Sequence, residues 1–441
     1  MAEIKINFGC ETGAFRDING FTNGPGFFKN KNFDTFASFK KLAPAWSRLH
    51  DTGFLSPNHR YVDIHKVFPR FSADPEDPKN YFFKDTDKYI ESLREAGCKI
   101  IYRLGYSATL SQKHKPHAAP PKDFRKWAAI CEHIVAHYTE GWADGMINAV
   151  DMWEIWNEPN LKIFWAGTNE EFLELYRVTA TRLRARFPEA KIGGCAFATG
   201  NEGLAEEFLA MCHEENLPLD FYSWHRYTND PSYYGVLSRE IKALLEKYGF
   251  GDIPSVLDEW NFNINFGDRV NESYKIIKSP EGAVFTAAAL SEIAASPVDI
   301  ATYYDYQINI MLKCYNGLMD LKCGPRGPYV APTATYTVYL YLKKLMSLQN
   351  MIEVEKTSDR LYTLASKKDN RAYLMVTNYK FEEAEDVEAA LGYLGEGFTD
   401  CRISRISENE KAAVIYEGVP PEKWTFGDKT VTFFEFYKRK A

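Results

Sequence analysis

Short apolar runs alternate with longer amphipathic segments along the first three quarters of the chain. The apolar runs are rich in β-branched and aromatic residues, whereas the segments between them, such as DTDKYIESLREAGC, carry apolar residues at helical spacing. Gly97 and Gly249 each follow such a segment, as helix-ending glycines do. The apolar runs begin near Ile4, Ala45, Lys99, Val150, Lys191, Asp220, Pro254 and Asp299. Eight strand-then-helix units predict a (β/α)₈ TIM barrel, an α/β fold.

The pattern changes after about residue 348, where short β-prone runs are separated by polar or glycine-containing turns. Examples are RLYTLAS, RAYLMVTNY, AAVIYEG and TVTFFEFYK. This spacing is typical of an antiparallel β-sandwich. We therefore expect a catalytic barrel over residues 1–348 and a smaller C-terminal sandwich over residues 349–441, which a strand from the N-terminus could complete. The tail offers no paired acids, so it is expected to pack on the barrel without adding a catalytic residue.

Charge and hydropathy exclude two classes of partner. The net charge is −7 and no Lys/Arg run occurs, so the electrostatic footprint of a nucleic-acid-binding protein is missing. No apolar run approaches the roughly 18 residues that a membrane span needs. The first residues have neither the basic nor the apolar region of an export signal, so the chain as given is expected to be cytoplasmic, although a removed signal would leave no trace. The sequence does not set the oligomeric state.

Cysteines and histidines indicate neither a disulfide framework nor a metal site. The eight cysteines are far apart, and reduced thiols are expected, although Cys314 and Cys323 could pair if the loop between them folds back. His133 and His137 lie one helical turn apart but have no third ligand nearby, and no HExxH motif occurs. We therefore expect no metal and no cofactor.

The run VDMWEIWNEPN, residues 150–160, ends a predicted strand with Glu158, which is held between Asn157 and a proline. Active sites of (β/α)₈ barrels lie at the C-terminal ends of the strands, so a polar residue at this point is a candidate for chemistry. The strand period of two places Glu154 and Trp156 on the same face as Glu158, deeper in the barrel. The fixed Asn-Glu-Pro turn favours a positioned carboxylate over a solvated loop residue.

A second acid, Glu259, ends the seventh predicted strand in PSVLDEWNF, residues 254–262. Strand parity groups it with Ser255 and Leu257 on the inward face. Two strand-end carboxylates facing one cavity are what glycoside hydrolysis requires, because one carboxyl protonates the departing oxygen while the other attacks or activates water. In a retaining enzyme the two carboxyls should lie about 5 to 5.5 Å apart.

Other strands supply polar neighbours for these acids. The inward positions are Trp46, Arg48 and His50 on the second strand and Phe221, Ser223 and His225, with Tyr227 just beyond, on the sixth. Arg48 and Tyr227 are the expected hydrogen-bond donors to Glu259. Arg48 could instead neutralise a buried Glu154, and Arg103 on the third strand competes for that pairing.

An Asn-Glu-Pro after strand four with a Glu after strand seven resembles the large clan of retaining (β/α)₈ glycosidases. More narrowly, SRLHDTGFLS, WEIWNEPN, SVLDEWN and the trailing sandwich are similar to glycoside hydrolase family 39, which includes β-xylosidases, α-L-iduronidases and bacterial endoglycosidases. The resemblance implies Glu158 as the general acid/base and Glu259 as the nucleophile. It also implies that Asn157 binds the sugar 2-hydroxyl and that His50 contacts another sugar hydroxyl.

Several features leave the substrate open. The eighth strand, DIATYYDYQ, ends in tyrosines where many clan members place a tryptophan, so Tyr304 is expected under the sugar. Trp260 could stack on a sugar or pack in the core, and His225 could contact substrate or be a core histidine. The chain after the strand-two motif departs from the acidic run of the xylosidases, so xylose specificity does not follow.

These observations together predict a metal-independent retaining glycoside hydrolase with a carbohydrate substrate. An iduronidase-like specificity is an alternative within the same family. A sugar-binding protein that has lost catalysis and a metal-dependent barrel hydrolase are the alternatives from other classes. The presence of both carboxylates favours the enzyme over the binding protein.

Overall fold

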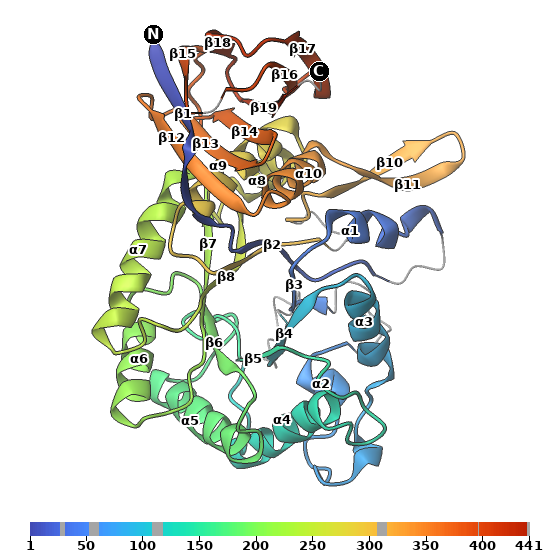
Figure 1. Cartoon of the computed structure of the whole chain (residues 1–441). Helices are drawn as coiled ribbons and strands as arrows, with labels where there is room; N and C mark the ends of the chain where they lie inside the picture. Colours follow the sequence, from blue (N-terminus) through green and yellow to red (C-terminus); the bar gives the residue numbers. More distant parts are fainter. Residues whose placement is uncertain (27–30, 53–60, 108–117, 307–314, 396, 439–441) are drawn as a thin grey trace.

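A computed structural model of the chain describes residues 1–26, 31–52, 61–107, 118–306, 315–395 and 397–438 (Figure 1). Parallel strands β2 to β9 close into a barrel in chain order. They are β2 (Asp17–Thr22), β3 (Trp46–Leu49), β4 (Lys99–Leu104), β5 (Met152–Ile155), β6 (Ile192–Phe197), β7 (Tyr222–Thr228), β8 (Ser255–Phe262) and β9 (Ile300–Tyr303). The predicted (β/α)₈ barrel is confirmed, and strands β3 to β9 each begin within two residues of the predicted start.

Helices follow the barrel strands and surround the barrel (Figure 1). They are α1 (Phe36–Leu42), α2 (Ile64–Val67), α3 (Lys84–Glu95), α4 (Phe124–Thr139), α5 (Asn169–Arg186), α6 (Leu204–Glu214), α7 (Ser232–Lys247), α8 (Val270–Ile277), α9 (Pro280–Ala294) and α10 (Ala334–Met346), with 3₁₀ turns at Lys31–Phe33 and Pro78–Asn80. Thr168 and Glu171 form a capping box at the start of α5. Gly97 and Gly249 follow α3 and α7 with positive φ, as predicted. Within the described ranges, no helix combines the length and apolarity that crossing a membrane requires.

A hairpin between β9 and α10 projects from the barrel (Figure 1). It consists of β10 (Met319–Gly324) and β11 (Gly327–Pro332), which pair antiparallel. Cys323 lies exposed on this hairpin. Its possible partner, Cys314, lies outside the described residues, so the expectation that these thiols are reduced stays a prediction.

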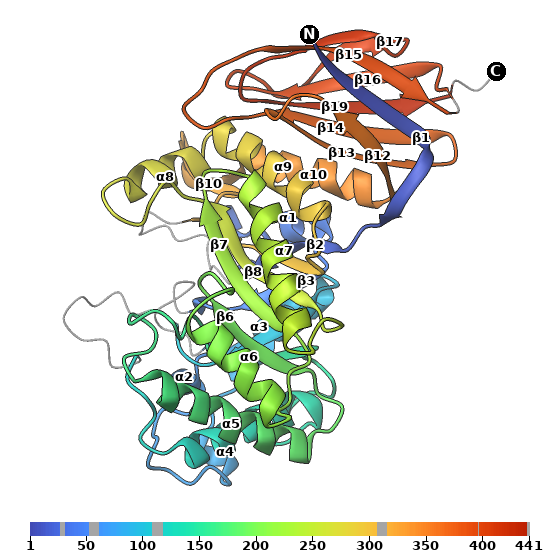
Figure 2. The same ribbon diagram turned by 90° about the vertical axis from the view of Figure 1, so that its left-hand side faces the viewer.

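A second sheet of nine strands packs on one side of the barrel (Figure 2). Its strands are β1 (Ala2–Ala14), β12 (Asn350–Lys356), β13 (Leu361–Lys368), β14 (Arg371–Asn378), β15 (Val387–Leu394), β16 (Asp400–Ile406), β17 (Lys411–Gly418), β18 (Lys423–Phe426) and β19 (Thr430–Tyr437). All pairings are antiparallel except the parallel pair of β1 and β15. One apolar cluster, which includes Phe8, Leu374 and Phe434, lies within this sheet. The contact with the barrel includes the ring of Tyr341 on α10, which stacks on Phe433 at 4.2 Å.

The run near Ile4 is not a barrel strand, which corrects its assignment as the first of the eight. It forms β1, which pairs with β12 and β15 in the nine-stranded sheet and lies in dark blue among the orange and red strands of Figure 2. Ile4, Ile6 and Phe8 are buried and alternate with less buried residues, the pattern of a strand with one solvated face. The first barrel strand is instead β2, whose sequence DINGFT is too short and polar to stand out. The division of the chain at residue 348 stays a prediction.

The barrel interior consists of an apolar floor below a charged layer. Trp46, Ile101, Met152, Phe221, Val256 and Ile300 form one buried cluster. Two residues further along β3, β4 and β5, the same faces carry Arg48, Arg103 and Glu154, all fully buried. The strand period therefore places buried charges directly beneath the open, C-terminal end of the barrel.

Candidate active site

The turn after β5 aims Asn157 and Glu158 into the barrel. Trp156 and Glu158 have positive φ values of 72° and 44°, an uncommon conformation for residues with side chains. The N–H of Trp156 donates to the carbonyl of Leu104 at 2.9 Å, and that of Glu158 donates to the carbonyl of Ala196 at 2.9 Å. The ends of β4 and β6 therefore hold the turn from both sides.

Trp156 points away from the barrel interior, which corrects the prediction that it shares a face with Glu158. Its indole packs among Trp127 and Trp165, with ring centroids at 5.8 and 5.1 Å. The regular strand ends at Ile155, so parity cannot be extended through the turn. Glu154 lies on the inward face as expected.

Asp258 and Glu259 both point into the barrel because β8 is irregular at this place. Its register with β7 pairs Trp224 with Leu257 and His225 with Glu259, so Asp258 has no partner residue. An extra residue of this kind is a bulge, which re-aims side chains and is frequent beside active sites. The inward residue before the bulge is Val256, a member of the apolar floor. The predicted inward grouping of Leu257 with Glu259 is therefore wrong, as is that of Ser255, whose hydroxyl accepts the indole N–H of Trp224.

Trp260 packs in the core and does not line the site, so of the two alternatives predicted for it the substrate contact is wrong. Its side chain is fully buried and packs edge-on against Tyr234 and Tyr303, with centroids at 5.7 and 5.1 Å. Because Glu259 faces inward after the bulge, the next residue must face the surrounding helices.

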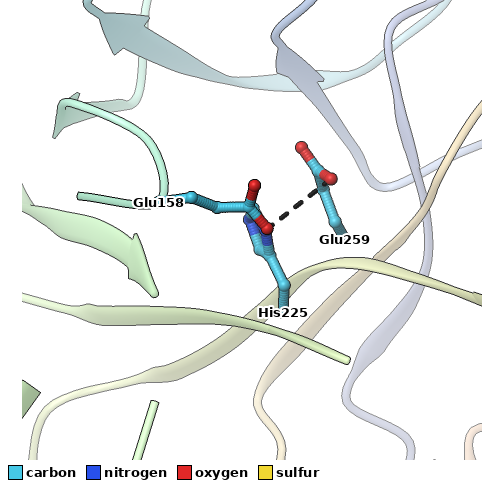
Figure 3. A group of neighbouring side chains, drawn as sticks. All are labelled: Glu158, His225 and Glu259. Carbon is cyan, nitrogen blue, oxygen red and sulfur yellow. Dashed lines mark hydrogen bonds and ion pairs between the residues drawn. The ribbon is translucent and has the colours of Figure 1, made fainter. Parts of the chain in front are cut away.

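Glu158 and Glu259 point toward each other, with His225 beside both (Figure 3). One carboxylate oxygen of each and one ring nitrogen of His225 all lie within 4.8 Å of one another. Nδ1 of His225 is 2.9 Å from Oε1 of Glu158 and 3.6 Å from Oε2 of Glu259. This spacing suits the roughly 5 to 5.5 Å between carboxyls of a retaining glycosidase better than the roughly 6.5 to 9.5 Å of an inverting one.

Glu259 is surrounded by hydrogen-bond donors. Arg48 Nη1 donates to Oε1 at 2.7 Å, and the Tyr227 hydroxyl donates to Oε2 at 2.7 Å. Burial and the charge of Glu259 raise the pKa of Tyr227 well above its ordinary value, so the phenol keeps its proton. Donors on both oxygens favour an ionised carboxylate.

Arg48 contacts three carboxyl groups at once. Its nitrogens lie 2.6 Å from Glu154, 2.7 Å from Asp258 and 2.7 Å from Glu259. Arg48 therefore both donates to Glu259 and neutralises the buried Glu154, so the two predicted roles of Arg48 occur together. Arg103 does not compete, because it pairs with Asp63 at 2.6 Å.

Asn157 has its amide orientation fixed by Arg48. Nη2 of Arg48 lies 2.6 Å from Oδ1 of Asn157, and a guanidinium can only donate. The amide nitrogen is buried and has no partner among the residues that the structure describes. Asn157 therefore offers an N–H donor beside the two catalytic candidates.

Glu154 and Asp258 form a buried pair of carboxyl groups, which lie 2.6 and 2.7 Å from nitrogens of Arg48. Two like charges buried side by side disfavour each other, so a proton on one of the two is favoured. Burial raises the pKa of Glu154 well above its ordinary value. Burial acts in the same direction on Asp258, but Arg48, Glu154 and His225 outweigh it and lower its pKa. The opposite directions of the two pKa shifts favour the proton on Glu154 and the negative charge on Asp258.

His225 is an imidazolium between carboxyl groups. Burial lowers its pKa, but the charges of Glu259 and Asp258 outweigh burial and raise the pKa to about 10. Nδ1 faces Glu158, and Nε2 lies 3.3 Å from Oδ1 of Asp258. Glu158, His225 and Glu259 also have the spacing of metal ligands, and an ion bound there would have to displace a proton from His225. The group therefore fits proton-transfer chemistry.

Glu158 is suited to hold a proton near neutrality. Burial raises its pKa above the ordinary value, whereas the hydrogen bond from His225 acts in the opposite direction. A buried carboxyl with a raised pKa beside an ionised one is the arrangement by which glycosidases separate acid from nucleophile.

The charge of His225 predicts a specific pH dependence of stability. Its folded-state pKa of about 10 is above the ordinary 6.5, so its contribution is complete below about pH 6.5 and is lost as the pH rises through about 10. We expect His225→Gln to reduce the free energy of unfolding most at pH 6 and least at pH 10. Urea unfolding at several pH values measures this, with exposed His213→Gln as the control. A destabilisation by His225→Gln that does not change with pH contradicts the charged state.

His50 and Tyr304 lie on the Glu259 side of the site. Nε2 of His50 is 3.7 Å from Oε1 of Glu259 and 3.4 Å from Oδ1 of Asp51. The Tyr304 hydroxyl donates to Oδ2 of Asp51 at 2.8 Å, and its ring centroid is 6.2 Å from that of Tyr227. Sequence reasoning missed Asp51 because strand parity sends it outward. Its positive φ of 52° breaks that parity.

Comparison with known proteins gives a family match over most of the chain. The sequence model of "Glycosyl hydrolases family 39" matches residues 56–413. A β-xylosidase of Caldicellulosiruptor saccharolyticus is 26% identical over 377 residues, which cover 77% of this chain and 74% of that protein. A β-xylosidase of Geobacillus stearothermophilus is 30% identical over 268 residues, which cover 54% of this chain and 51% of that protein.

Solved structures resemble the whole chain. A glucosidase from Croceicoccus marinus superposes with a TM-score of 0.77 at 22% identity over 100% of both chains. A monomeric β-xylosidase from Caulobacter crescentus CB15 has a TM-score of 0.72 at 18% identity over 99% of both chains. At these identities the likeness extends to the fold, the barrel together with the attached sheet.

Proposed function

Because the chain belongs to glycosyl hydrolases family 39, a family of retaining glycosidases, we propose that Glu259 is its nucleophile and Glu158 its general acid/base. The observation that carries this assignment is the close approach of the two carboxyls, within 4.8 Å at their nearest ligand atoms, in opposite electrostatic surroundings. Glu259 receives donors from Arg48 and Tyr227, whereas burial raises the pKa of Glu158.

In the first step, Glu259 attacks the anomeric carbon while Glu158 gives its proton to the departing oxygen. This forms a covalent glycosyl-enzyme and releases the aglycone. In the second step, Glu158 takes a proton from water, which attacks the same carbon and frees Glu259. The imidazolium of His225, 2.9 Å from Glu158, stabilises the carboxylate that Glu158 becomes between the two steps.

The charges of the layer around Arg48 balance in the ground state of this scheme. Arg48 and His225 are positive, Asp258 and an attacking Glu259 are negative, and Glu154 holds a proton. This group of side chains is neutral only if Glu158 also holds its proton, and Asp51 beside His50 adds further negative charge to the site. An ionised Glu158 before catalysis would leave a net negative charge in a low-dielectric site, which is costly.

Sugar hydroxyls have several partners in this scheme. The free amide N–H of Asn157 is suited to the 2-hydroxyl, since it lies beside Arg48 and both glutamates. His50 faces Glu259 with its Nε2 and serves a second hydroxyl. The ring of Tyr304, close to Tyr227, serves as an apolar surface under the sugar.

The charges around Glu259 favour neutral sugars over uronosyl groups. A substrate carboxylate needs a cation, and among the described residues close to Glu259, Arg48 is engaged by three carboxyl groups and Arg103 by Asp63. Asp51 adds a carboxylate close to His50, 3.4 Å from its Nε2. Together with the two β-xylosidase relatives, this supports a β-xyloside or a related neutral β-glycoside as substrate, and not an iduronidase-like specificity.

A panel of nitrophenyl glycosides tests the proposed function. We expect cleavage of the β-D-xyloside or another neutral β-glycoside, with retained configuration in the first-formed product by NMR, and far weaker cleavage of uronosides. Glu259→Ala, prepared in the same way, controls for contaminating enzymes. An inverted product excludes the double displacement, and preference for a uronoside excludes the proposed selectivity. Sugar binding without turnover of any glycoside would support the non-catalytic alternative.

A further inference from the structure

A buried chain of hydrogen bonds reaches His50 through Nδ1, the ring nitrogen opposite the one that faces Glu259. Arg103 on β4 donates from Nε to Nδ1 of His50 at 3.0 Å and from Nη2 to Oδ1 of Asp63 at 2.6 Å. Oδ1 of Asp63 also accepts from the backbone N–H of Ser107 at 2.9 Å and from its hydroxyl at 2.8 Å. All four side chains are buried. Arg103 is therefore held in place from the side remote from His50.

This chain of contacts determines which nitrogen of His50 carries the proton. A guanidinium has donors only, so Nδ1 must accept. Burial and the positive charges of Arg103 and Arg48 hold the pKa of His50 well below its ordinary value, so the ring is neutral. A neutral imidazole has one N–H, which is then on Nε2. That N–H faces Asp51 at 3.4 Å and Glu259 at 3.7 Å.

The charged groups around His50 act in opposite directions. They are Arg48, Asp51, Arg103, His225 and Glu259. The three cations favour a neutral ring, whereas the two carboxylates favour an imidazolium. An imidazolium here would pair with Glu259 and weaken it as a nucleophile. The opposite tautomer would present a lone pair to a hydroxyl that needs a donor.

We propose that Arg103, anchored by Asp63, is a positioning residue that fixes His50 as an Nε2–H donor to a sugar hydroxyl beside Glu259. The identity of the ligand rests on the proposed function, but the tautomer of His50 does not. Arg103 itself contacts no reacting atom. Its role is to keep one donor aimed at the sugar and to keep positive charge on His50 from competing for the nucleophile.

The first test reads the tautomer without substrate. Protein with ¹⁵N-labelled histidine is examined by NMR, and the His50 signals are identified by their loss in His50→Gln. We expect an unprotonated Nδ1 and a protonated Nε2 in the wild type across neutral pH. In Arg103→Met we expect the pKa of His50 to rise toward its ordinary value and a proton to appear on Nδ1, since the donor to Nδ1 and one of the nearby cations are removed. A proton on Nδ1 in the wild type, or a His50 unchanged by Arg103→Met, overturns the proposal.

The second test measures kcat/KM against pH on the best glycoside of the panel. We expect Arg103→Met to lower kcat/KM by about 10- to 100-fold, an effect similar to that of removing the outer partner of a metal-binding histidine. Its pH profile should also gain an ionisation on the acidic side, from His50. Arg103→Lys should keep the acid limb closer to that of the wild type, since it retains the charge. Arg360→Met is the matched control, because Arg360 is a buried arginine paired with Asp428 in the nine-stranded sheet.

A double-mutant cycle separates positioning from general damage. The amide of His50→Gln can donate from the Nε2 position whether or not Arg103 is present, so Arg103→Met should cost far less in that background. Full additivity of the two losses indicates a merely structural role and overturns the proposal. If Arg103→Met does not fold, the same measurements are made on Asp63→Asn and Arg103→Lys. If the wild type cleaves no glycoside, the proposed function fails while the NMR result still decides the tautomer.

Discussion

Glu259→Ala is expected to lose nearly all activity on every glycoside, whereas Glu158→Ala should lose activity in proportion to how poor the leaving group is. Without Glu259 no covalent intermediate can form. Without Glu158 a dinitrophenolate can still depart unaided, but an alkoxide cannot, and general acid assistance is worth roughly 10²- to 10⁴-fold. Pre-steady-state rates of aglycone release on dinitrophenyl and alkyl glycosides measure this difference.

Added azide separates the two roles further. In Glu158→Ala, azide should intercept the glycosyl-enzyme and give a glycosyl azide of retained configuration. In Glu259→Ala, azide should occupy the space of the missing carboxylate, attack directly and give the inverted azide. NMR of the products distinguishes the two outcomes. A loss that is independent of leaving group, with no azide product, would mean that the acid in question only positions the sugar, and Asp258 or Glu154 would have to be reconsidered.

Those two alternatives are separated from the catalytic pair by depth in the barrel. Glu154 and Asp258 have no exposed surface, whereas Glu158 and Glu259 are 9% and 5% exposed. A sugar entering from the open end of the barrel therefore meets the second pair first. Glu154 and Asp258 are therefore positioned to influence the charge of neighbouring side chains and do not reach the anomeric carbon.

The sequence predicts the catalytic candidates because their positions depend on local features. Glu158 and Glu259 each end a run of apolar alternation, and a barrel directs all such ends to one face. The same alternation could have separated β1 from the barrel strands. Residues of β1 alternate between buried and exposed, whereas β3 and β6 are buried throughout, as barrel strands covered by helices are.

Other features of the site depend on distant parts of the chain and leave no local pattern. The bulge at Asp258 arises from the register with β7, and it reverses the side on which Ser255 and Leu257 lie relative to Glu259. The positive φ of Asp51 turns a carboxylate that parity sends outward. The pairing of Arg103 with Asp63 joins residues from different barrel units. Such contacts follow from the closed barrel and cannot be read from spacing along one strand.

Arg48→Met is expected to destabilise the fold by about 3 to 5 kcal/mol, the usual cost of removing one partner of a buried ion pair. Arg48 is fully buried and neutralises a layer that contains Glu154, Asp258 and Glu259. Its loss leaves His225 as the one cation against two ionised carboxylates within that group. Urea unfolding at pH 7 measures the change. Arg48→Lys keeps the charge but has fewer donors, so its free energy of unfolding should lie between those of Arg48→Met and the wild type.

The proton assignment of the deep pair decides which second substitution relieves this strain. Asp258 carries the charge and Glu154 the proton, so Arg48→Met/Asp258→Asn restores a balance between His225 and Glu259 and should recover much of the lost stability. Arg48→Met/Glu154→Gln replaces a group that is already neutral and should recover little. Asp258→Asn and Glu154→Gln are also measured as single variants of the wild type, so that the effect of each alone can be subtracted. Recovery in the opposite order would mean that the proton lies on Asp258, and the ion pair of Asp258 with His225 at 3.3 Å would then lose its negative partner.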